Sequence, residues 1–590
     1  MGFLRNMMMG IMGSKTNKQP RLGGFRAALF VYVMAGLENM SFIAIGVSIY
    51  TYFFGYMNFS LTKSANTLTN FMGTAYLLSL FGGFVSDTYL SRFKTSVLFG
   101  LLEVLGYCLL TAQAHFEQLR PTPCKDITSN ILGLCEKSTK SQEALLFAGL
   151  YLVAFGISGT KAATPALGAD QFDEKDPKEA AKLPTYFNFL IFAMTFGAII
   201  GTTLLVWINQ NEGWDLAFGI CTISLFAGIL ILIAGRSVYR HNVLQGSPLV
   251  RIMRVLVVAV RNRNLPRPQK TEDFHEIHDE EANNKHGEIL PKSDQLKFLD
   301  RAAIVRPTTQ HTGPWRLCTV TQVEETKIIV RMLPIILSTI FMNTCLAQLQ
   351  TFSVQQSTTL DPYIGSFKVP SPSLPIIPFL AMFLLLPLYE YVFVPVVRKF
   401  TGIPTGIRQL QRIGIGLVLS AISMAVAGAV ETRRLRVARE NNMIDSPNYL
   451  PMSVFWLGYQ YTIFGVADMF MLVGMLDFFY AESSAGMKSL GTAISWCSFA
   501  FGYYISTVVV NIVNKVSGGW FVSNNLNRDK LNYFYYLLAG LSVLNFGVYL
   551  LCASWYKYKV VEVKKVDGIQ ENGQSGNTEK SSDSIGIEGK

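Results

Sequence analysis

The chain carries about twelve apolar stretches, each roughly 20 to 28 residues long and separated from the next by a polar segment. A stretch of this length crosses a bilayer as an α-helix, because a helix satisfies its backbone polar groups internally. Of the 590 residues, 50% are hydrophobic and 15% are charged, whereas soluble proteins carry about a quarter charged residues. The sequence therefore predicts an all-α membrane protein that crosses the bilayer many times.

A long polar segment divides the apolar stretches into two equal sets. The expected spans are 26–55, 64–90, 93–117, 143–167, 183–209, 215–237, 327–355, 374–396, 409–431, 453–480, 489–514 and 531–555. Two six-helix bundles, 26–237 and 327–555, joined by a cytoplasmic linker at 238–326, are typical of the major facilitator fold of transporters. We expect a cytoplasmic N-terminus at 1–25 and a disordered cytoplasmic tail at 556–590.

The lysines and arginines of the short loops set the expected orientation. Those before the first span, after the last span and in two short loops of the first bundle fall on one side, which we take as cytoplasmic. One group disagrees, because this orientation places Arg433, Arg434, Arg436 and Arg439 outside. The net charge of +11 is then interpreted as anchoring at the lipid bilayer and not as nucleic-acid binding. The plasma membrane is the expected location.

The predicted extracellular loop between the third and fourth spans contains Cys124 and Cys135. An oxidising compartment permits a disulfide between them. We therefore treat this pair as a candidate disulfide.

The sequence shows no constellation that predicts an enzyme, a metal site or a cofactor site. It has no GxxxxGK[ST] phosphate-binding loop, so transport would use an ion gradient or be facilitative. His275 and His278 have metal-ligand chemistry, but their spacing and the mixed charge around them favour a solvated loop.

Few ionisable residues fall inside the predicted spans, where each is costly to bury unless it is paired or lines a polar cavity. The candidates that we single out are Glu38, Glu103, Lys161, Asp468 and Asp477. Glu38 lies ~18 Å along the first helix and Lys161 ~10 Å before the cytoplasmic end of the fourth, so a lysine side chain can join them. The pair is either a switch, opened by protonation or substrate binding, or a static link between two helices. We favour the switch, because both helices are rich in Gly and Ser and can line a cavity.

The two aspartates of the tenth span face opposite ways, because nine positions correspond to about half a turn out of phase at ~100° per residue. Asp468 is deeper and is the candidate for the cavity, whereas Asp477 is interpreted as structural. Glu103 has no motif beside it, and we expect it to form a hydrogen bond between packed helices.

Four motifs occur in order along the membrane domain, at 82–95, 159–172, 348–356 and 478–490. Together they resemble the signatures of the plant nitrate/peptide transporter family, the plant branch of the proton-coupled oligopeptide transporters. The resemblance implies a major facilitator fold of twelve transmembrane helices, a small substrate and transport coupled to protons.

The resemblance also implies roles for individual residues. Lys161 matches the lysine of the fourth helix that takes part in proton coupling, and Asp468 falls where the family has a substrate-binding glutamate. Asp87 and Arg92 belong to the signature after the second helix, which we interpret, like Asp477, as gating or structural.

Two departures from the family pattern bear on mechanism. The first helix of the family carries ExxE[RK], but here only Glu38 of these charges remains and Asn39 follows it. At the junction before helix eleven, Ser484 replaces a proline, which frees a backbone N–H and relaxes the turn. The sequence thus leaves Lys161 with one obvious acidic partner.

Thr95 follows Arg92 by three positions at the expected cytoplasmic start of the third helix. Phosphorylation by a cytoplasmic kinase would add nearly two negative charges beside basic side chains. The alternative, a threonine that serves only the helix N-terminus, is the favoured interpretation.

The form of helix one resembles a plant subgroup linked to nitrate, abscisic acid and gibberellin, all of them anions at cytosolic pH. Lys161, Asn39, Gln348 and Tyr32 offer donors for an anion. Trp496 offers an aromatic wall for a larger organic acid, although a packing role is favoured.

The function hypotheses follow from these residues. The first is a proton-coupled secondary transporter of nitrate or of a carboxylate such as abscisic acid or gibberellin. The second is a membrane nitrate sensor that transports little or nothing, motivated by the reduced first-helix motif and by Ser484. A di- or tripeptide transporter is a further alternative, because Asp468 and Lys161 would meet the two ends of a peptide.

Overall fold

The structure is a computed structural model of the chain. It describes residues 22–59, 61–122, 136–173, 176–180, 182–240, 248–265, 274–275, 290, 292–304, 315–402, 406–446, 448–483, 487–518, 520 and 526–558. Cys124, Cys135 and Ser484 lie outside the described residues, so the disulfide and the role of Ser484 stay predictions.

Helices α2 to α11 form the N-terminal bundle. They are α2 (Gly24–Gly55), α3 (Leu61–Leu77), α4 (Ser79–Thr88), α5 (Arg92–His115), α7 (Lys140–Ala169), α8 (Pro177–Ala180), α9 (Leu183–Ile200), the π-helical turn η2 (Gly201–Leu205), α10 (Val206–Asn211) and α11 (Trp214–Ala234). The hydroxyl of Thr139 and the side chain of Gln142 form a capping box that starts α7, the helix that carries Lys161.

Helices α14 to α21 form the C-terminal bundle. They are α14 (Val320–Gln350), α15 (Phe352–Thr358), α16 (Ile376–Leu388), the π-helical turn η7 (Tyr389–Phe393), α17 (Val394–Thr401), α18 (Gln409–Glu440), α19 (Gly458–Glu482), α20 (Lys488–Val516) and α21 (Leu531–Trp555). Proline lies at the second position of α17, directly after η7, where its missing N–H interrupts the regular helix.

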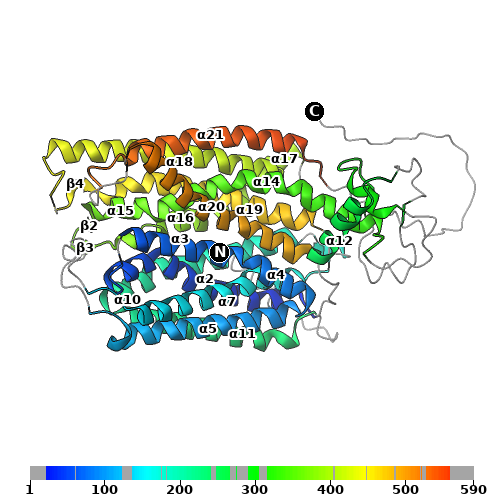
Figure 1. The fold of residues 1–590 in the computed structure, drawn as a ribbon, viewed down its shortest axis with the longest axis horizontal. Helices are drawn as coiled ribbons and strands as arrows, with labels where there is room; N and C mark the ends of the chain where they lie inside the picture. Colours follow the sequence, from blue (N-terminus) through cyan, green and yellow to red (C-terminus); the bar gives the residue numbers. More distant parts are fainter. Residues whose placement is uncertain are drawn as a thin grey trace, which may run out of the picture.

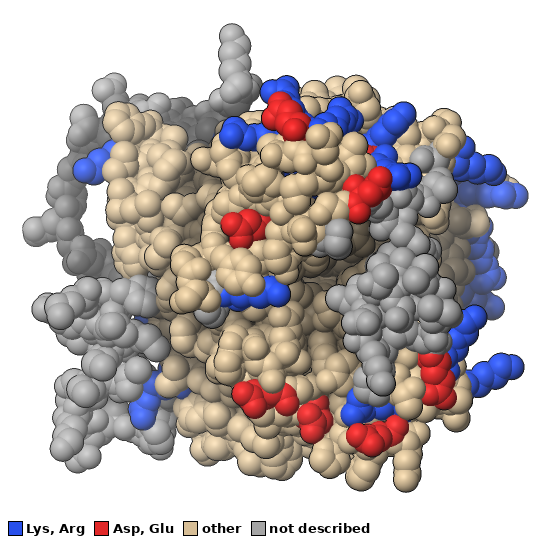
Figure 2. Space-filling model, turned by 90° about the vertical axis from the view of Figure 1, so that its left-hand side faces the viewer, with Lys and Arg blue, Asp and Glu red and all other residues tan. Residues whose placement is uncertain are grey.

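Short elements mark the two ends of the molecule. β1 (Leu360–Asp361) pairs in parallel with β4 (Leu450–Ser453), and β2 (Tyr363–Ile364) pairs antiparallel with β3 (Phe367–Lys368). These strands define the strand end in Figure 1, and helix α12 (Pro248–Arg261) of the linker lies at the opposite linker end. Figure 2 views the strand end, where basic and acidic side chains are interspersed.

Within the described residues, twelve helices are long and apolar enough to cross a membrane. They are 24–55, 66–88, 92–115, 140–169, 185–211, 214–237, 320–358, 371–401, 409–440, 454–479, 493–516 and 531–555. This agrees with the prediction of twelve membrane-spanning helices. In Figure 1 the N-terminal bundle, blue to cyan, lies below the C-terminal bundle, green to red.

The ninth span differs from its predicted end at residue 431, because α18 continues to Glu440. The arginines that disagreed with the charge rule therefore lie on helix α18 and not in a loop. Arg434 is fully buried and forms an ion pair with Glu431 at 2.7 Å, while Arg433 lies 3.9 Å from the centre of the Trp456 ring. The contacts of Arg434 with Glu431 and of Arg433 with Trp456 allow the helix to continue through this charged segment.

Candidate functional site

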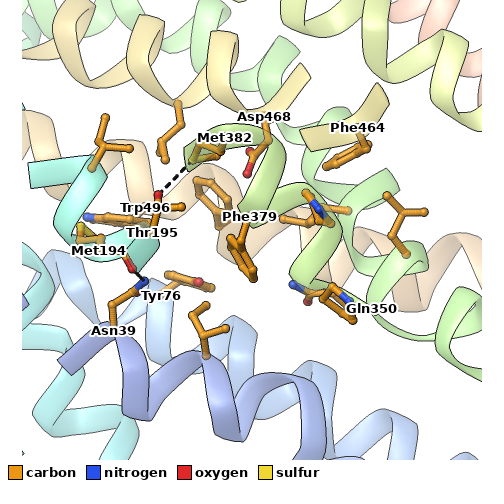
Figure 3. Close-up of a pocket in the computed structure, with 18 of the residues that line it drawn as sticks. Asn39, Tyr76, Met194, Thr195, Gln350, Phe379, Met382, Phe464, Asp468 and Trp496 are labelled. Atoms are coloured by element: carbon orange, nitrogen blue, oxygen red, sulfur yellow. Dashed lines mark hydrogen bonds between the residues drawn. The ribbon is translucent and has the colours of Figure 1, made fainter. Parts of the chain in front are cut away.

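A cavity of about 100 Å³ lies between the two bundles. Its polar side chains are few, namely Asn39, Lys161, Thr195, Gln350 and Asp468. Aromatic rings supply much of the remaining wall: Tyr76, Phe379, Tyr461, Phe464, Trp496, Phe499 and Tyr503. Both bundles contribute to it, as Figure 3 shows with Asn39 and Tyr76 on one side and Asp468 and Phe464 on the other.

Lys161 forms the ion pair that the sequence predicted to be within reach. Its Nζ lies 3.0 Å from Oε2 of Glu38 and 2.9 Å from Oδ1 of Asn39. The amide nitrogen of Asn39 donates to the carbonyl of Met194 at 2.8 Å, which fixes the amide oxygen toward the lysine. The lysine is 4% exposed, so its charge is compensated inside the protein.

Aromatic rings complete the surroundings of Lys161. Its Nζ lies 5.0 Å from the centre of the Phe42 ring and 5.6 Å from that of Trp496. Trp496 stacks on Tyr76 with ring centres 5.7 Å apart, and this contact joins the two bundles. Since a ring face attracts a cation, these rings add favourable contacts for the ammonium group. Trp496 also lines the cavity, which is the position that an aromatic wall for an organic acid requires.

Asp468 reaches the cavity from α19, across from Asn39 (Figure 3). Asp477 does not line it. Asp477 Oδ2 lies 3.7 Å from Arg412 of α18. This agrees with the expectation that Asp468 and Asp477 lie on opposite faces of their helix.

The structure does not place two expected anion donors at the cavity. Gln348 is fully buried and donates to Ser506 at 2.6 Å, and Tyr32 donates to the carbonyl of Tyr186. Gln350 lines the cavity instead. Residues two positions apart on a helix point about 200° apart, so the sequence pattern alone did not select the correct glutamine.

Asp87 and Arg92 belong to an ion cluster at the linker end of the N-terminal bundle. Arg92 hydrogen-bonds Asp170 of α7 and lies 3.6 Å from Asp87. This cluster links the ends of three helices, which suits a gating or structural role. Nearby, Arg240 donates to Glu179, and this hydrogen bond holds the pKa of the Glu179 carboxyl below its ordinary value.

Thr95 is fully buried at the start of α5. Its hydroxyl is therefore out of reach of a kinase in this conformation. The phosphorylation site stays a prediction, and it would require α5 to separate from its neighbours.

Several polar contacts were not anticipated from the sequence. Asn188 of α9 donates to Glu390 of η7 at 2.8 Å, which joins the two bundles in their linker-end half. Thr195 bonds the sulfur of Met382 across the cavity. The available signal was Glu390 itself, an acidic residue inside the apolar stretch at 374–396. Among the described residues, no cluster of three or more His, Cys, Asp or Glu side chains fits a metal ion.

Comparison with known proteins gives consistent matches. The model of the POT family matches residues 93–524. Arabidopsis thaliana NRT1/PTR FAMILY 4.6 is 41% identical over 568 residues, covering 91% of this chain and 95% of that protein. NRT1/PTR FAMILY 4.5 of the same plant is 42% identical over 553 residues, with 92% and 95% covered. The crystal structure of an auto-inhibited POT family peptide transporter shares the fold, with 17% identity, a TM-score of 0.61, and 92% and 99% covered.

Proposed function

The chain belongs to the POT family and is a multi-pass membrane transporter, and on this basis we propose that it is a proton-coupled symporter of a small organic carboxylate. We place it in the plasma membrane, where a proton gradient is available to drive uptake. Transport would proceed by alternating access, with the two bundles moving about the cavity between them.

The observation that carries this proposal is the composition of the cavity. Its aromatic wall suits a ligand with an apolar body. Lys161 supplies one buried cation for a carboxylate. Abscisic acid and gibberellin have this chemistry, a hydrophobic ring system with a single carboxylate. Nitrate would satisfy the lysine but has no apolar surface to match the aromatic wall.

The ion pair suggests how the proton enters the cycle. Glu38 and a substrate carboxylate compete for the same ammonium group of Lys161. Protonation of Glu38 removes its charge and frees Lys161 to bind the substrate. Proton and anion would therefore bind together, and release of the proton would restore the Glu38–Lys161 pair and expel the anion.

One observation favours a different substrate class. Asp468 lies in the cavity together with Lys161, and a di- or tripeptide presents an amine and a carboxylate to such a pair. The relative affinities for a hydrophobic carboxylate and a dipeptide decide between these alternatives.

The test is uptake in oocytes at acidic and neutral pH with labelled abscisic acid, gibberellin, nitrate and a dipeptide. We expect the oocytes to take up a hydrophobic carboxylate. This uptake should increase at acidic pH and be accompanied by an inward proton current. The current and water-injected oocytes control for passive entry of the neutral acid. If the protein reaches the oocyte surface but transports none of these compounds, the result would instead support the nitrate sensor.

Replacement of the lysine tests the site itself. Lys161→Ala is expected to abolish uptake while leaving the amount of protein at the surface unchanged, because the variant removes the only cation lining the cavity in the described residues. Unchanged uptake would remove Lys161 from the mechanism.

A further inference from the structure

A second carboxyl is buried beside the Glu38–Lys161 pair and has no role in the function proposed above. Glu103 lies in the middle of α5 and is 0% exposed. Its Oε2 accepts a hydrogen bond from the hydroxyl of Thr160 at 3.4 Å. Its Oε1 is buried without a hydrogen-bond partner among the described residues. A buried carboxyl with one unmatched oxygen is costly to keep ionised.

Close packing of α5 against α7 brings this carboxyl to the transport site. A side chain at Gly156 would lie 2.5 Å from the backbone nitrogen of Glu103, so only glycine allows this approach. Thr160, the partner of Glu103, directly precedes Lys161 in the chain. Glu103 is near enough to Glu38 and Lys161 for its charge to interact with theirs.

Thr160 and Glu38 also share a small cavity. Its volume is about 10 Å³, and Ala35 and Lys161 are among its other lining residues. A space of this size has room for about one water molecule, beside Glu38, Thr160 and Lys161. Glu38 Oε1 is buried and lacks a partner among the described residues. A hydroxyl and water can therefore connect the two carboxyls.

The charges of this cluster do not balance if both carboxyls are ionised. Two carboxylates would face one ammonium in a site shielded from bulk solvent, and the second negative charge would be uncompensated. The other titratable groups that face Glu103 are Tyr107 on its own helix and Cys221 on α11, and both are ordinarily neutral at physiological pH. The charges balance if one of the two carboxyls carries a proton.

We propose that Glu103 stores this proton and delivers it to Glu38 when a substrate carboxylate takes over Lys161. The O–H bond of the Glu103 carboxyl breaks, and the proton passes by way of the Thr160 hydroxyl and cavity water to Oε1 of Glu38. Glu103 becomes a carboxylate and regains a proton from the side of higher proton concentration, which is the proton co-transported with the substrate. This inference rests on the proposed symport and extends its proton path to a third helix.

The test is the pH profile of uptake of the carboxylate that the wild type carries. Glu103→Gln keeps the shape and polarity of the side chain but cannot donate a stored proton to Glu38. We expect uptake to fall by at least about tenfold at neutral pH, with recovery at acidic pH, where Glu38 is protonated directly from solvent. Thr160→Val should shift the profile in the same direction. A Glu103→Gln profile parallel to that of the wild type would overturn the proposal and leave a packing role.

Two controls keep this test decisive. Thr111→Val removes a comparable hydroxyl from α5 at the contact with Thr222, away from the ion pair, and should leave the pH profile unchanged. If Glu103→Gln does not reach the membrane, Thr160→Val carries the test of the pH profile.

A second measurement does not depend on transport. Infrared spectra of the purified protein at neutral pH should contain a protonated carboxyl band, sensitive to deuterium exchange, that Glu103→Gln or Thr160→Val removes or shifts. Spectra without such a band overturn the proposal. If the wild type transports none of the compounds offered but shows the band, the proposed symport fails while the stored proton stands.

Discussion

Lys161 shows how one lysine can stay charged in the middle of a membrane protein. Glu38 neutralises it, the oxygen of Asn39 accepts a second hydrogen bond, and the rings of Phe42 and Trp496 lie near its ammonium group. Asn39 therefore keeps a contact with the lysine without adding a second negative charge. The proposed transport of a carboxylate requires such a single cation.

Asp468 is the residue whose substitution best separates an anion carrier from a peptide carrier. Among the described residues it has no hydrogen bond or ion pair, although it lines the cavity that holds Lys161. At a separation on the order of 10 Å, an ionised Asp468 would repel a substrate carboxylate by roughly 1.5 kcal/mol. We therefore expect Asp468→Asn to lower the KM for the carboxylate by up to about tenfold at a pH where the wild-type aspartate is ionised.

Uptake kinetics at neutral and acidic pH measure this effect, which should shrink where the wild-type aspartate is protonated. Asp477→Asn serves as the matched control, because Asp477 lies outside the cavity beside Arg412. A higher KM for Asp468→Asn would contradict the repulsion and show that the carboxyl recognises a polar group of the substrate, as a peptide carrier requires.

At the same scale, the sequence predicted the ion pair but not every cavity residue. Glu38 and Lys161 were identifiable because charges inside apolar spans are rare and their depths are set by helix rise. Gln350 and Gln348 differ only in the rotation of α14, which is fixed by packing against other helices. No local pattern in the sequence reports that rotation.

Among the elements, α18 shows why a helix boundary was predicted wrongly. The four arginines after residue 431 indicated a loop. The helix continues because Arg434 forms an ion pair with Glu431 and also donates hydrogen bonds to Asn527 and to the carbonyl of Leu526. The carboxylate of Glu431 accepts a further bond from Gln356 of α15 at 2.6 Å. This buried polar network joins several helices near the strand end of the molecule. Local composition does not reveal such partners, because they come from distant parts of the chain.

Arg434→Met is expected to destabilise the C-terminal bundle, because it leaves the carboxylate of Glu431 buried with its cation removed. Breaking a buried pair in this way costs about 3–5 kcal/mol. Arg433→Met is the matched control, since Arg433 is exposed and loses only its contact with the Trp456 ring, worth about 0.5–1 kcal/mol.

Thermal unfolding of the purified protein and the amount of protein at the surface measure the difference. The double variant Glu431→Gln/Arg434→Met should be less destabilised than Arg434→Met alone, because it removes the orphaned charge. Equal unfolding temperatures for Arg434→Met and Arg433→Met would show that the buried pair contributes nothing to stability.

For the whole molecule, the sequence predicted two bundles and a linker, but the way the bundles meet came only from the structure. Their contacts run along α3 and α20, through Thr74 and Tyr504 at 3.0 Å and Thr69 and Thr507 at 3.3 Å. They are hydrogen bonds between small polar side chains and stacked rings, with no periodic signature in the sequence. Weak, numerous contacts of this type suit surfaces that separate and rejoin during a transport cycle.

A cross-link between the bundles tests whether that separation is needed for transport. Thr69 and Thr507 lie in the half of the membrane domain nearest the strand end, and their hydroxyls are close enough that Thr69→Cys/Thr507→Cys should form a disulfide on oxidation. The oxidised double variant is expected to lose uptake and to regain it after reduction, because the strand ends of the two bundles can no longer part. Each single variant, treated in the same way, controls for oxidation of other cysteines. Full uptake by a completely cross-linked protein would show that α3 and α20 stay together throughout the cycle, and the moving surfaces would then lie at the contact of α9 with η7.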